Sequence, residues 1–233
     1  MMVADAANLH TFVDAFRFIG DNPSFLLQKA WEQLVLSGAA LGLALLVALP
    51  LGIALGHLHR GSGFAIGASI FGRGLPSLVL IAAFLTILGI GFVNNMVALA
   101  VLATGPILTN AYDSVEGVDR DAVEAARGMG MTQLQILRQV ELPLAIPLLF
   151  TGIRVSAVTV VATAPIAAIA GGGGLGDIIV NQASYRLSGV LGASLCVMGL
   201  SAAVFLGLLG AQVAVTPRGL RQTSVTNDPQ RKE

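Results

Sequence analysis

Long apolar runs alternate with short polar stretches along most of this chain. Asp, Glu, Lys and Arg are absent from four stretches, which are Gln33 to Gly56, Gly74 to Tyr112, Val155 to Gly176 and Leu187 to Pro217. A helix needs about 20 mainly apolar residues to cross the hydrocarbon core of a bilayer, so each stretch fits one span and the second fits two. The pattern therefore predicts an all-α integral membrane protein of about five spans.

Turn and breaker residues divide these runs into expected spans at 33–56, 64–88, 93–112, 146–170 and 188–212. Gly89 to Asn95 is expected to form the turn before the third span, because Gly and Asn favour tight reversals. The glycine run from Gly171 to Gly174 is expected to end the fourth span, and Asp177 to cap the helix after it. Arg73 leaves open a split of 64–88 into an interfacial helix and a shorter span, and a count of six spans also stays open.

The chain divides into three expected regions. Residues 1–32 form an extracytoplasmic or interfacial segment, in which Phe12, Phe16 and Ile19 have the spacing of a short amphipathic helix. Residues 33–212 form the transmembrane domain, and residues 213–233 form a polar tail that is expected to be disordered.

Composition excludes a soluble domain and gives no sign of nucleic-acid binding. Hydrophobic residues make up 55% of the chain and charged residues 11%, and the net charge is zero; soluble proteins average about 25% charged residues. The single cysteine, Cys196, excludes an internal disulfide. Trp31, Tyr112 and Tyr185 stand near span ends, where aromatic rings prefer the membrane interface. With one Trp and two Tyr, the chain has few residues from which to build an aromatic cage around a quaternary ammonium.

The basic residues predict the orientation. One side of the expected topology carries Arg60, Arg120, Arg127, Arg138, Arg218, Arg221, Arg231 and Lys232, with Arg73 and Arg154 at its edge. The other side carries Arg17, Lys29 and Arg186. The positive-inside rule then places the N-terminus outside and the C-terminus on the cytoplasmic side of the membrane, which the chain crosses several times.

The loop 113–145, on the cytoplasmic side, has the signals of two short helices. Asp119 can cap a helix over 120–129, which Gly128 and Gly130 end. Thr132 and Gln135 have the spacing of a capping box, and Pro143 is expected to stop the second helix. Its apolar stripe is expected at Leu134, Leu137 and Val140.

An ordered polar loop between spans indicates a protein partner in the aqueous phase. Ala125 and Ala126 are expected to let the partner's backbone approach closely, and Met129 and Met131 to offer adaptable apolar contact.

The spacing of this loop is specific. Glu-Ala-Ala is followed after three residues by Gly, and after nine more by an aliphatic residue, any residue and Leu-Pro; the matching residues are Glu124, Ala125, Ala126, Gly130, Val140, Leu142 and Pro143. On this motif the chain resembles the permeases of binding-protein-dependent ABC importers. Over about residues 24–212 it looks most like the osmoprotectant (glycine betaine, carnitine, choline) permeases, with Leu49–Ile53, Arg73–Ser77 and Gly152–Arg154 among the similar stretches.

The resemblance implies a MetI-like bundle in a bacterial cytoplasmic (inner) membrane, whose loop docks as a coupling helix on an ATP-binding cassette subunit. It implies two ATPase chains, a second permease chain that is either a copy of this one or a different chain, and a substrate-binding protein. ATP and Mg²⁺ are then bound by the ATPase, and this chain holds no catalytic residue, cofactor or metal. Pro165 stands where such permeases are expected to have Thr or Ser.

Candidate residues for the translocation path or gate are Pro76, Asn110, Arg154, Thr163 and Gly173. Arg154 is either an interfacial anchor, an intersubunit partner or part of a gate. Helix-to-helix hydrogen bonding explains Asn110 and Thr163 equally well.

Two other patterns have weaker functional readings. Gly171, Gly173 and Gly176 match G-x-G-x-x-G but lack the strand and acidic residue of a dinucleotide site. His57 and His59 lack further metal ligands nearby and are expected to be interfacial.

Three alternative functions remain open. The first is an ABC permease for an amino acid or another small solute. The second is an ATP-independent secondary carrier or channel, against which the spans show no buried carboxylate. The third is a membrane enzyme, for which no catalytic cluster is evident.

Overall fold

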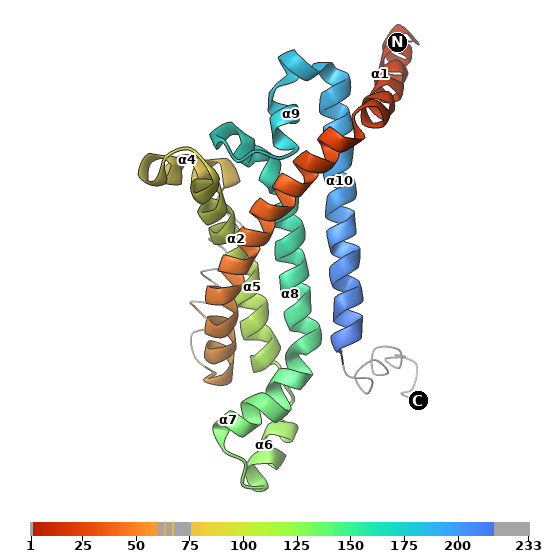
Figure 1. Ribbon diagram of the computed structural model, residues 1–233. Coiled ribbons are helices and arrows are strands. Elements are labelled where there is room, and N and C mark those ends of the chain that lie inside the picture. The colour runs from red at the N-terminus through yellow and green to blue at the C-terminus, as the bar shows by residue number, and fades with distance from the viewer. Residues whose placement is uncertain (1, 60–62, 64–66, 68–75, 217–233) are drawn as a thin grey trace, which may run out of the picture.

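The computed structural model describes residues 2–59, 63, 67 and 76–216, and within this part of the chain the regular structure is helical throughout (Figure 1). The helices are α1 (Met2–Asp21), α2 (Pro23–His57), α4 (Ser77–Leu88), α5 (Phe92–Glu116), α6 (Arg120–Gly128), α7 (Gln133–Ile136), the π-helix η1 (Leu137–Glu141), α8 (Leu142–Thr163), the 3-10 helix η2 (Ala164–Ala170), α9 (Gly176–Val180) and α10 (Gln182–Val215). The predicted all-α membrane fold is confirmed.

Four described helical segments are long and apolar enough to cross a membrane: α2, α5, the continuous run Gln133–Ala170 and α10. They correspond to the expected spans one, three, four and five. The expected span 64–88 appears only as the 12-residue α4, because most of 64–75, including Arg73, lies outside the described residues.

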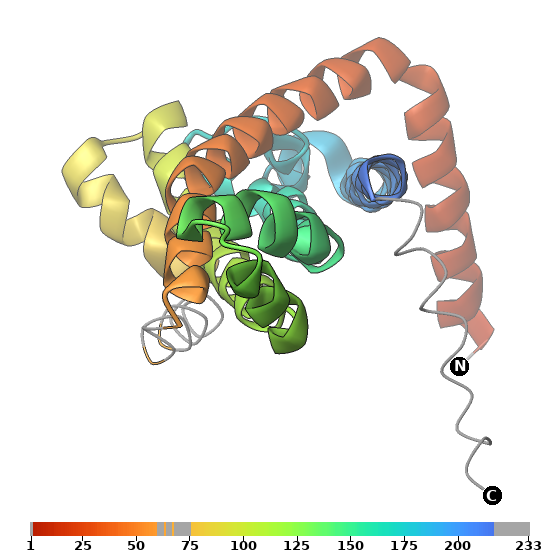
Figure 2. The same ribbon diagram turned by 90° about the horizontal axis from the view of Figure 1, so that it is seen from below.

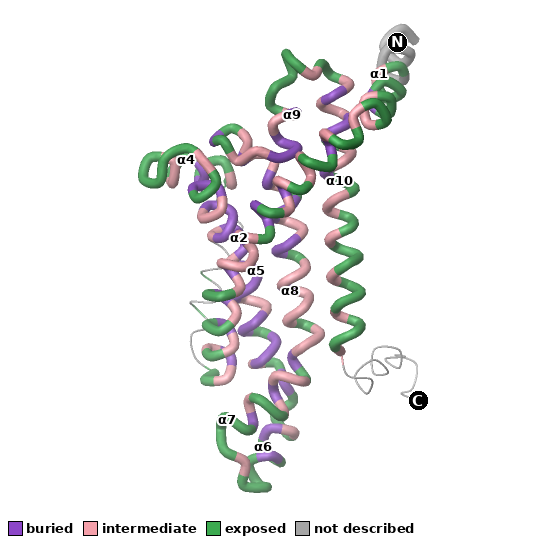
Figure 3. The backbone as a smooth tube through the Cα atoms, in the orientation of Figure 1, coloured by how far each residue is buried: buried purple, intermediate pink, exposed green. Residues whose placement is uncertain are grey.

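Helix α5 forms the centre of the bundle, between α2 and α8 (Figures 1 and 2). The side of α2 that faces α5 carries small residues, at Ala44, Ala48, Gly52 and Gly56. A Cβ atom added to Gly52 would lie 2.6 Å from the carbonyl oxygen of Leu108, so these two helices pack backbone against backbone. Buried residues concentrate on α5, whereas α10 is largely exposed along its length (Figure 3), as expected of a helix that faces lipid.

The N-terminal region is more helical than expected. Helix α2 begins at Pro23, ten residues before the expected start of the first span. Helix α1 packs on α10 through Ala15 and Phe18, and the Phe18 ring lies near Gly189 and Gly192. Phe12 and Phe16 are exposed, as the outer face of an amphipathic helix would be.

The turn before α5 is shorter than predicted. It comprises Gly89 to Gly91, whose glycines have φ of 74° and 137°, and the prediction that Asn94 and Asn95 belong to it is wrong. Both are buried inside α5. The Asn95 side-chain amide donates to the carbonyls of Gly91 (2.8 Å) and Ala170 (3.0 Å), so hydrogen bonds to a neighbouring element override its turn preference.

Two further expectations are wrong. Tyr112 lies near the end of α5, but it is only 4% exposed and packs in the α2–α5 core, so its ring does not face lipid as an aromatic belt requires. Asp177 lies in the first turn of α9, after the N-cap Leu175, and its carboxylate binds Lys29 instead of capping the helix. The Asp177 side chain is engaged in a tertiary ion pair with Lys29 and is therefore not available to cap its own helix.

Candidate functional site

The loop with the Glu-Ala-Ala motif forms a compact unit at one end of the bundle, where α6 and α7 lie beyond the ends of the spans (Figure 1). The Asp119 carboxylate accepts a hydrogen bond from the backbone of Asp121 (3.0 Å). In the capping box, Thr132 N–H donates to Gln135 Oε1 (2.8 Å), and Gln135 N–H donates to Thr132 Oγ1 (3.4 Å). Both predicted caps are confirmed, so local sequence signals shape this loop.

Gly130 separates the two helices. Its φ is +81°, in the left-handed region that glycine adopts without strain. The glycine of the motif is therefore required by the backbone of the turn itself.

The loop has its own small core, and it corrects two predictions. Val118, Val123, Ala126 and Ile136 are buried together. Ala126 is 1% exposed, so it packs inside the loop and cannot let a partner's backbone approach, whereas Ala125 is exposed. The predicted stripe is wrong at Leu134, which is 56% exposed while Ile136 is the buried position of α7; Val140 of the stripe does pack against the loop core.

The outer surface of the loop offers apolar side chains beside charges. Met129 is 76% exposed, and Met131 is half-buried against the loop core. Together with Leu134, Met129 gives this surface the apolar contacts that a protein partner would cover.

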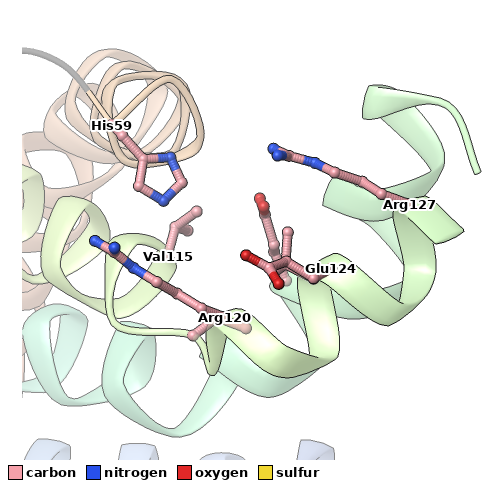
Figure 4. Close-up of a pocket in the computed structure, with 8 residues that line it drawn as sticks. His59, Val115, Arg120, Glu124 and Arg127 are labelled. Atoms are coloured by element: carbon pink, nitrogen blue, oxygen red, sulfur yellow. The ribbon is translucent and has the colours of Figure 1, made fainter.

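Glu124 lies in a groove of about 310 Å³ between the loop and the end of α2. The groove is lined by His59, Val115, Val118, Arg120, Val123, Glu124, Arg127 and Glu141. Arg120 and Arg127 extend on either side of Glu124, and His59 points into the groove from just beyond the end of α2 (Figure 4). The groove thus presents both signs of charge, which suits recognition of a polar partner surface.

Pro143, the last residue of the motif, does not end the second helix of the loop as predicted, and Leu142 is the first residue of α8. The chain continues without a break from α7 through η1 into α8, and Pro143 lies in the first turn of α8. In the π-turn, the Leu142 N–H donates to the carbonyl of Leu137, five residues back. This wider turn accommodates a proline ring that would clash with the carbonyl four residues back in a regular helix.

Glu141, at the end of this π-turn, is a functional candidate that the motif does not single out, because the motif accepts any residue at this position. Its Oε2 lies 2.6 Å from Nδ1 of His57, and its side chain is 2% exposed. His57, which is expected at the membrane interface, is the last residue of α2, and its side chain is 15% exposed and held by this contact. The only sequence signal was a carboxylate between two apolar residues, Val140 and Leu142.

Among the described residues, no three His, Cys, Asp or Glu side chains are grouped as a metal site requires.

The five candidate path residues, all within the described part of the chain, form their contacts with other residues, and no hydrogen bond joins any two of the five. Asn110 donates to the carbonyl of Pro106 (2.8 Å) and contacts Gly152 where α5 crosses α8. Thr163 donates to the carbonyl of Thr159 (2.7 Å), and Pro76 is the exposed residue before α4. Their role in a path stays a prediction.

Arg154 and Gly173 also have specific neighbours. The Arg154 Nη1 donates to Gln212 Oε1 on α10 (2.8 Å), and its guanidinium lies 5.0 Å from the centroid of the Phe205 ring. Gly173 has φ of +71° and lies beside the Glu32 carboxylate.

At the other end of the bundle, ionic contacts hold the glycine run against α2. Lys29 Nζ lies 2.7 Å from Asp177 Oδ2 and 2.9 Å from Glu32 Oε2. The Gly174 N–H donates to the same Glu32 oxygen (3.1 Å). The G-x-G-x-x-G match therefore lies between helices in a membrane bundle, without the strand that a dinucleotide site needs.

Comparison with known proteins agrees with this arrangement. Residues 48–219 match the family described as binding-protein-dependent transport system inner membrane component. The glycine betaine/carnitine/choline transport system permease protein OpuCB of Bacillus subtilis is 38% identical over 88% of this chain and 94% of its own length. The choline transport system permease protein OpuBB of the same organism is 37% identical over 88% of this chain and 95% of its own length.

A solved structure has the same fold. The chain matches the MetNI methionine ABC transporter, in inward-facing conformations, with a TM-score of 0.70 and 24% identity. The match covers 82% of this chain and 96% of that chain. At this level of identity the likeness concerns the fold alone.

Proposed function

The chain belongs to the family of inner membrane components of binding-protein-dependent transport systems, and on that premise we propose that it is the permease of an ATP-driven importer for quaternary-ammonium osmoprotectants. Glycine betaine, choline and carnitine are the substrates of this class. The proposal of substrate is supported by the similarity to osmoprotectant permeases over 88% of the chain.

The observation that carries the proposed mechanism is the coupling loop. It is an ordered unit with a buried core of its own, exposed Met129 and Leu134, and a charged groove around Glu124. A loop that only joined two spans would need neither its own core nor exposed large apolar side chains. We infer that this surface docks on an ATP-binding cassette subunit.

The helix that leaves the loop provides a path for force. From Gln133 to Ala170 the chain is helical without a break, so displacement of α7 is transmitted directly along α8. ATP binding by the partner closes the ATPase subunits, moves the loop and shifts the bundle between inward-facing and outward-facing states. ATP hydrolysis and Mg²⁺ binding belong to the ATPase, and this chain supplies the path.

The proposed assembly contains two permease chains, two ATPase chains and a substrate-binding protein on the outer side. The docking role of the loop places α6 and α7 in the cytoplasm. The distribution of basic residues then puts the N-terminus outside and the C-terminus inside.

Uptake of labelled glycine betaine tests this function in an osmosensitive, uptake-deficient bacterial host that carries the permease, its ATPase and its binding protein. We expect accumulation that disappears when the ATPase carries a substitution that blocks ATP hydrolysis. Glu124→Arg should abolish uptake while the chain still inserts in the membrane. Accumulation of an amino acid instead of glycine betaine would assign the chain to amino-acid import, and uptake that survives the inactive ATPase would identify a secondary carrier.

A further inference from the structure

We propose that the contact between His57 and Glu141 is a positioning contact that makes the first span move as one body with the coupling loop. The inference rests on the proposed transport function and adds a second mechanical connection to it. The loop already continues into α8, and this contact would join it to α2 as well.

The geometry of the pair is that of a specific tertiary bond. His57 is the last residue of α2, and Glu141 ends the π-turn η1, 84 residues later in the chain. Their Nδ1 and Oε2 atoms lie 2.6 Å apart, and the two side chains are 15% and 2% exposed. Gln139, in the same π-turn, is exposed. The turn therefore directs Glu141, and not its polar neighbour, toward α2.

The end of α2 is also fixed to α5 immediately beside this contact. A Cβ atom on Gly56 would lie 2.7 Å from the carbonyl oxygen of Tyr112 and 3.0 Å from Cβ of Val115. Because α2 and α5 pack backbone against backbone here, the position of His57 is set by the bundle. Displacement of Glu141 must consequently either carry α2 and α5 with it or break the contact.

Breaking the contact is unfavourable. Glu141 is almost completely buried, and a buried carboxylate that loses its partner keeps the penalty of having left water. The alternative, in which the pair stays closed while the loop and the end of α2 move together, leaves both groups paired. We therefore infer that the contact persists through the transport cycle.

The first test measures substrate transported per ATP hydrolysed, with the assembled importer in liposomes. His57→Ala and Glu141→Gln should each lower this ratio about tenfold, a typical magnitude for coupling between sites, while ATP hydrolysis continues. The double variant should be no worse than either single variant, because both remove one shared interaction. An exposed histidine outside the loop serves as the control: His10→Ala, on α1, should leave the ratio unchanged.

An exchange variant separates positioning from general stability. His57→Glu combined with Glu141→His restores a pair of the same chemistry in the reverse order, and it should recover most of the transport ratio. A ratio that stays low in the exchange variant, or single variants with a normal ratio, would overturn the proposal.

A reversible cross-link between positions 57 and 141 tests whether the pair stays closed during transport. This test can be used even where the single variants insert poorly into the membrane. His57→Cys and Glu141→Cys are introduced together in a Cys196→Ser background, and a short bis-methanethiosulfonate reagent bridges the two thiols. We expect the bridged protein to transport, and the same protein to lose coupling once a reductant releases the bridge. Transport that is blocked by the bridge and restored by reduction would show that the contact opens, which contradicts the proposal.

The transport function and the role of the His57–Glu141 contact can be disproved separately. If wild-type protein shows no ATP-dependent uptake of any solute, the proposed function itself is wrong. If wild-type uptake is normal and the variants keep the wild-type ratio of transport to ATP hydrolysis, only the role of His57 and Glu141 is wrong.

Discussion

The Nζ atom of Lys29 lies 2.7 Å from Oδ2 of Asp177, which ties α2 to α9 across 148 residues of sequence. The same ammonium binds Glu32 on its own helix, and Glu32 accepts a hydrogen bond from the backbone of Gly174. One lysine thus organises the segment that follows the fourth span. The glycine run, which has positive φ at Gly171, Gly173 and Gly174, is held in place by side chains from a distant helix.

Loss of this lysine should loosen the glycine run. Lys29→Met removes the ammonium from Glu32 and Asp177, whose side chains are 35% and 38% exposed. Because solvent screens such partly exposed pairs, we expect the free energy of unfolding of the purified chain to fall by only about 1 kcal/mol. Protease cleavage near Gly174 should rise more clearly than the melting temperature falls.

A matched pair on α1 serves as the control for this variant. Arg17 and Asp14 lie 3.8 Å apart with side chains 75% and 56% exposed. Asp14→Asn should change neither melting nor cleavage. If Lys29→Met behaves like this control, the ionic contacts do not hold the glycine run.

Substitution of Gly130 should disturb the turn of the coupling loop. A valine at φ of +81° places a β-branched side chain in the left-handed region, which costs about 1–2 kcal/mol. We expect Gly130→Val to reduce co-purification of the ATPase and to lower uptake. Gly128→Val is the matched control, because Gly128 also has open space where a Cβ atom would lie but ends α6 without a positive φ. Equal effects of the two substitutions would show that the conformation of Gly130 is not important.

The two alanines of the motif should respond differently to a larger side chain. Ala126 is buried in the loop core, so Ala126→Leu should destabilise the loop by about 1–3 kcal/mol through overpacking. Ala125 is exposed, so Ala125→Leu should leave the isolated chain unchanged and weaken only binding of the ATPase. Hydrogen exchange of the loop in the absence of the ATPase distinguishes them. Rapid exchange in both variants would contradict the assigned burial.

The sequence could predict the spans and the loop because each depends on local information. Hydropathy over a window of residues reports a span, and the caps at Asp119 and Thr132 depend on side chains within three residues. The burial of Ala126 could not be predicted, because it depends on how α6 packs against Ile136. The motif includes both alanines but does not indicate which of them faces inward.

The remaining errors also come from contacts between distant segments. Asn95 has a turn-forming side chain but binds the carbonyl of Ala170, 75 residues away. Pro143 has the character of a helix breaker, yet the preceding π-turn accommodates it. His57 and Glu141 are paired only because α2 ends beside the π-turn. None of these partners can be identified from hydropathy or spacing within one segment.

Arg154 should act as a structural anchor between α8 and α10. Its guanidinium donates to Gln212, which itself donates to the carbonyl of Pro147 (3.1 Å), and it lies over the Phe205 ring. Arg154→Ala removes these contacts and should lower stability in detergent by about 1–2 kcal/mol. Arg154→Lys should restore part of this stability, and both variants should keep the wild-type number of substrate molecules per ATP. If Arg154→Lys is as stable as wild type but transports nothing, the residue belongs to the gate.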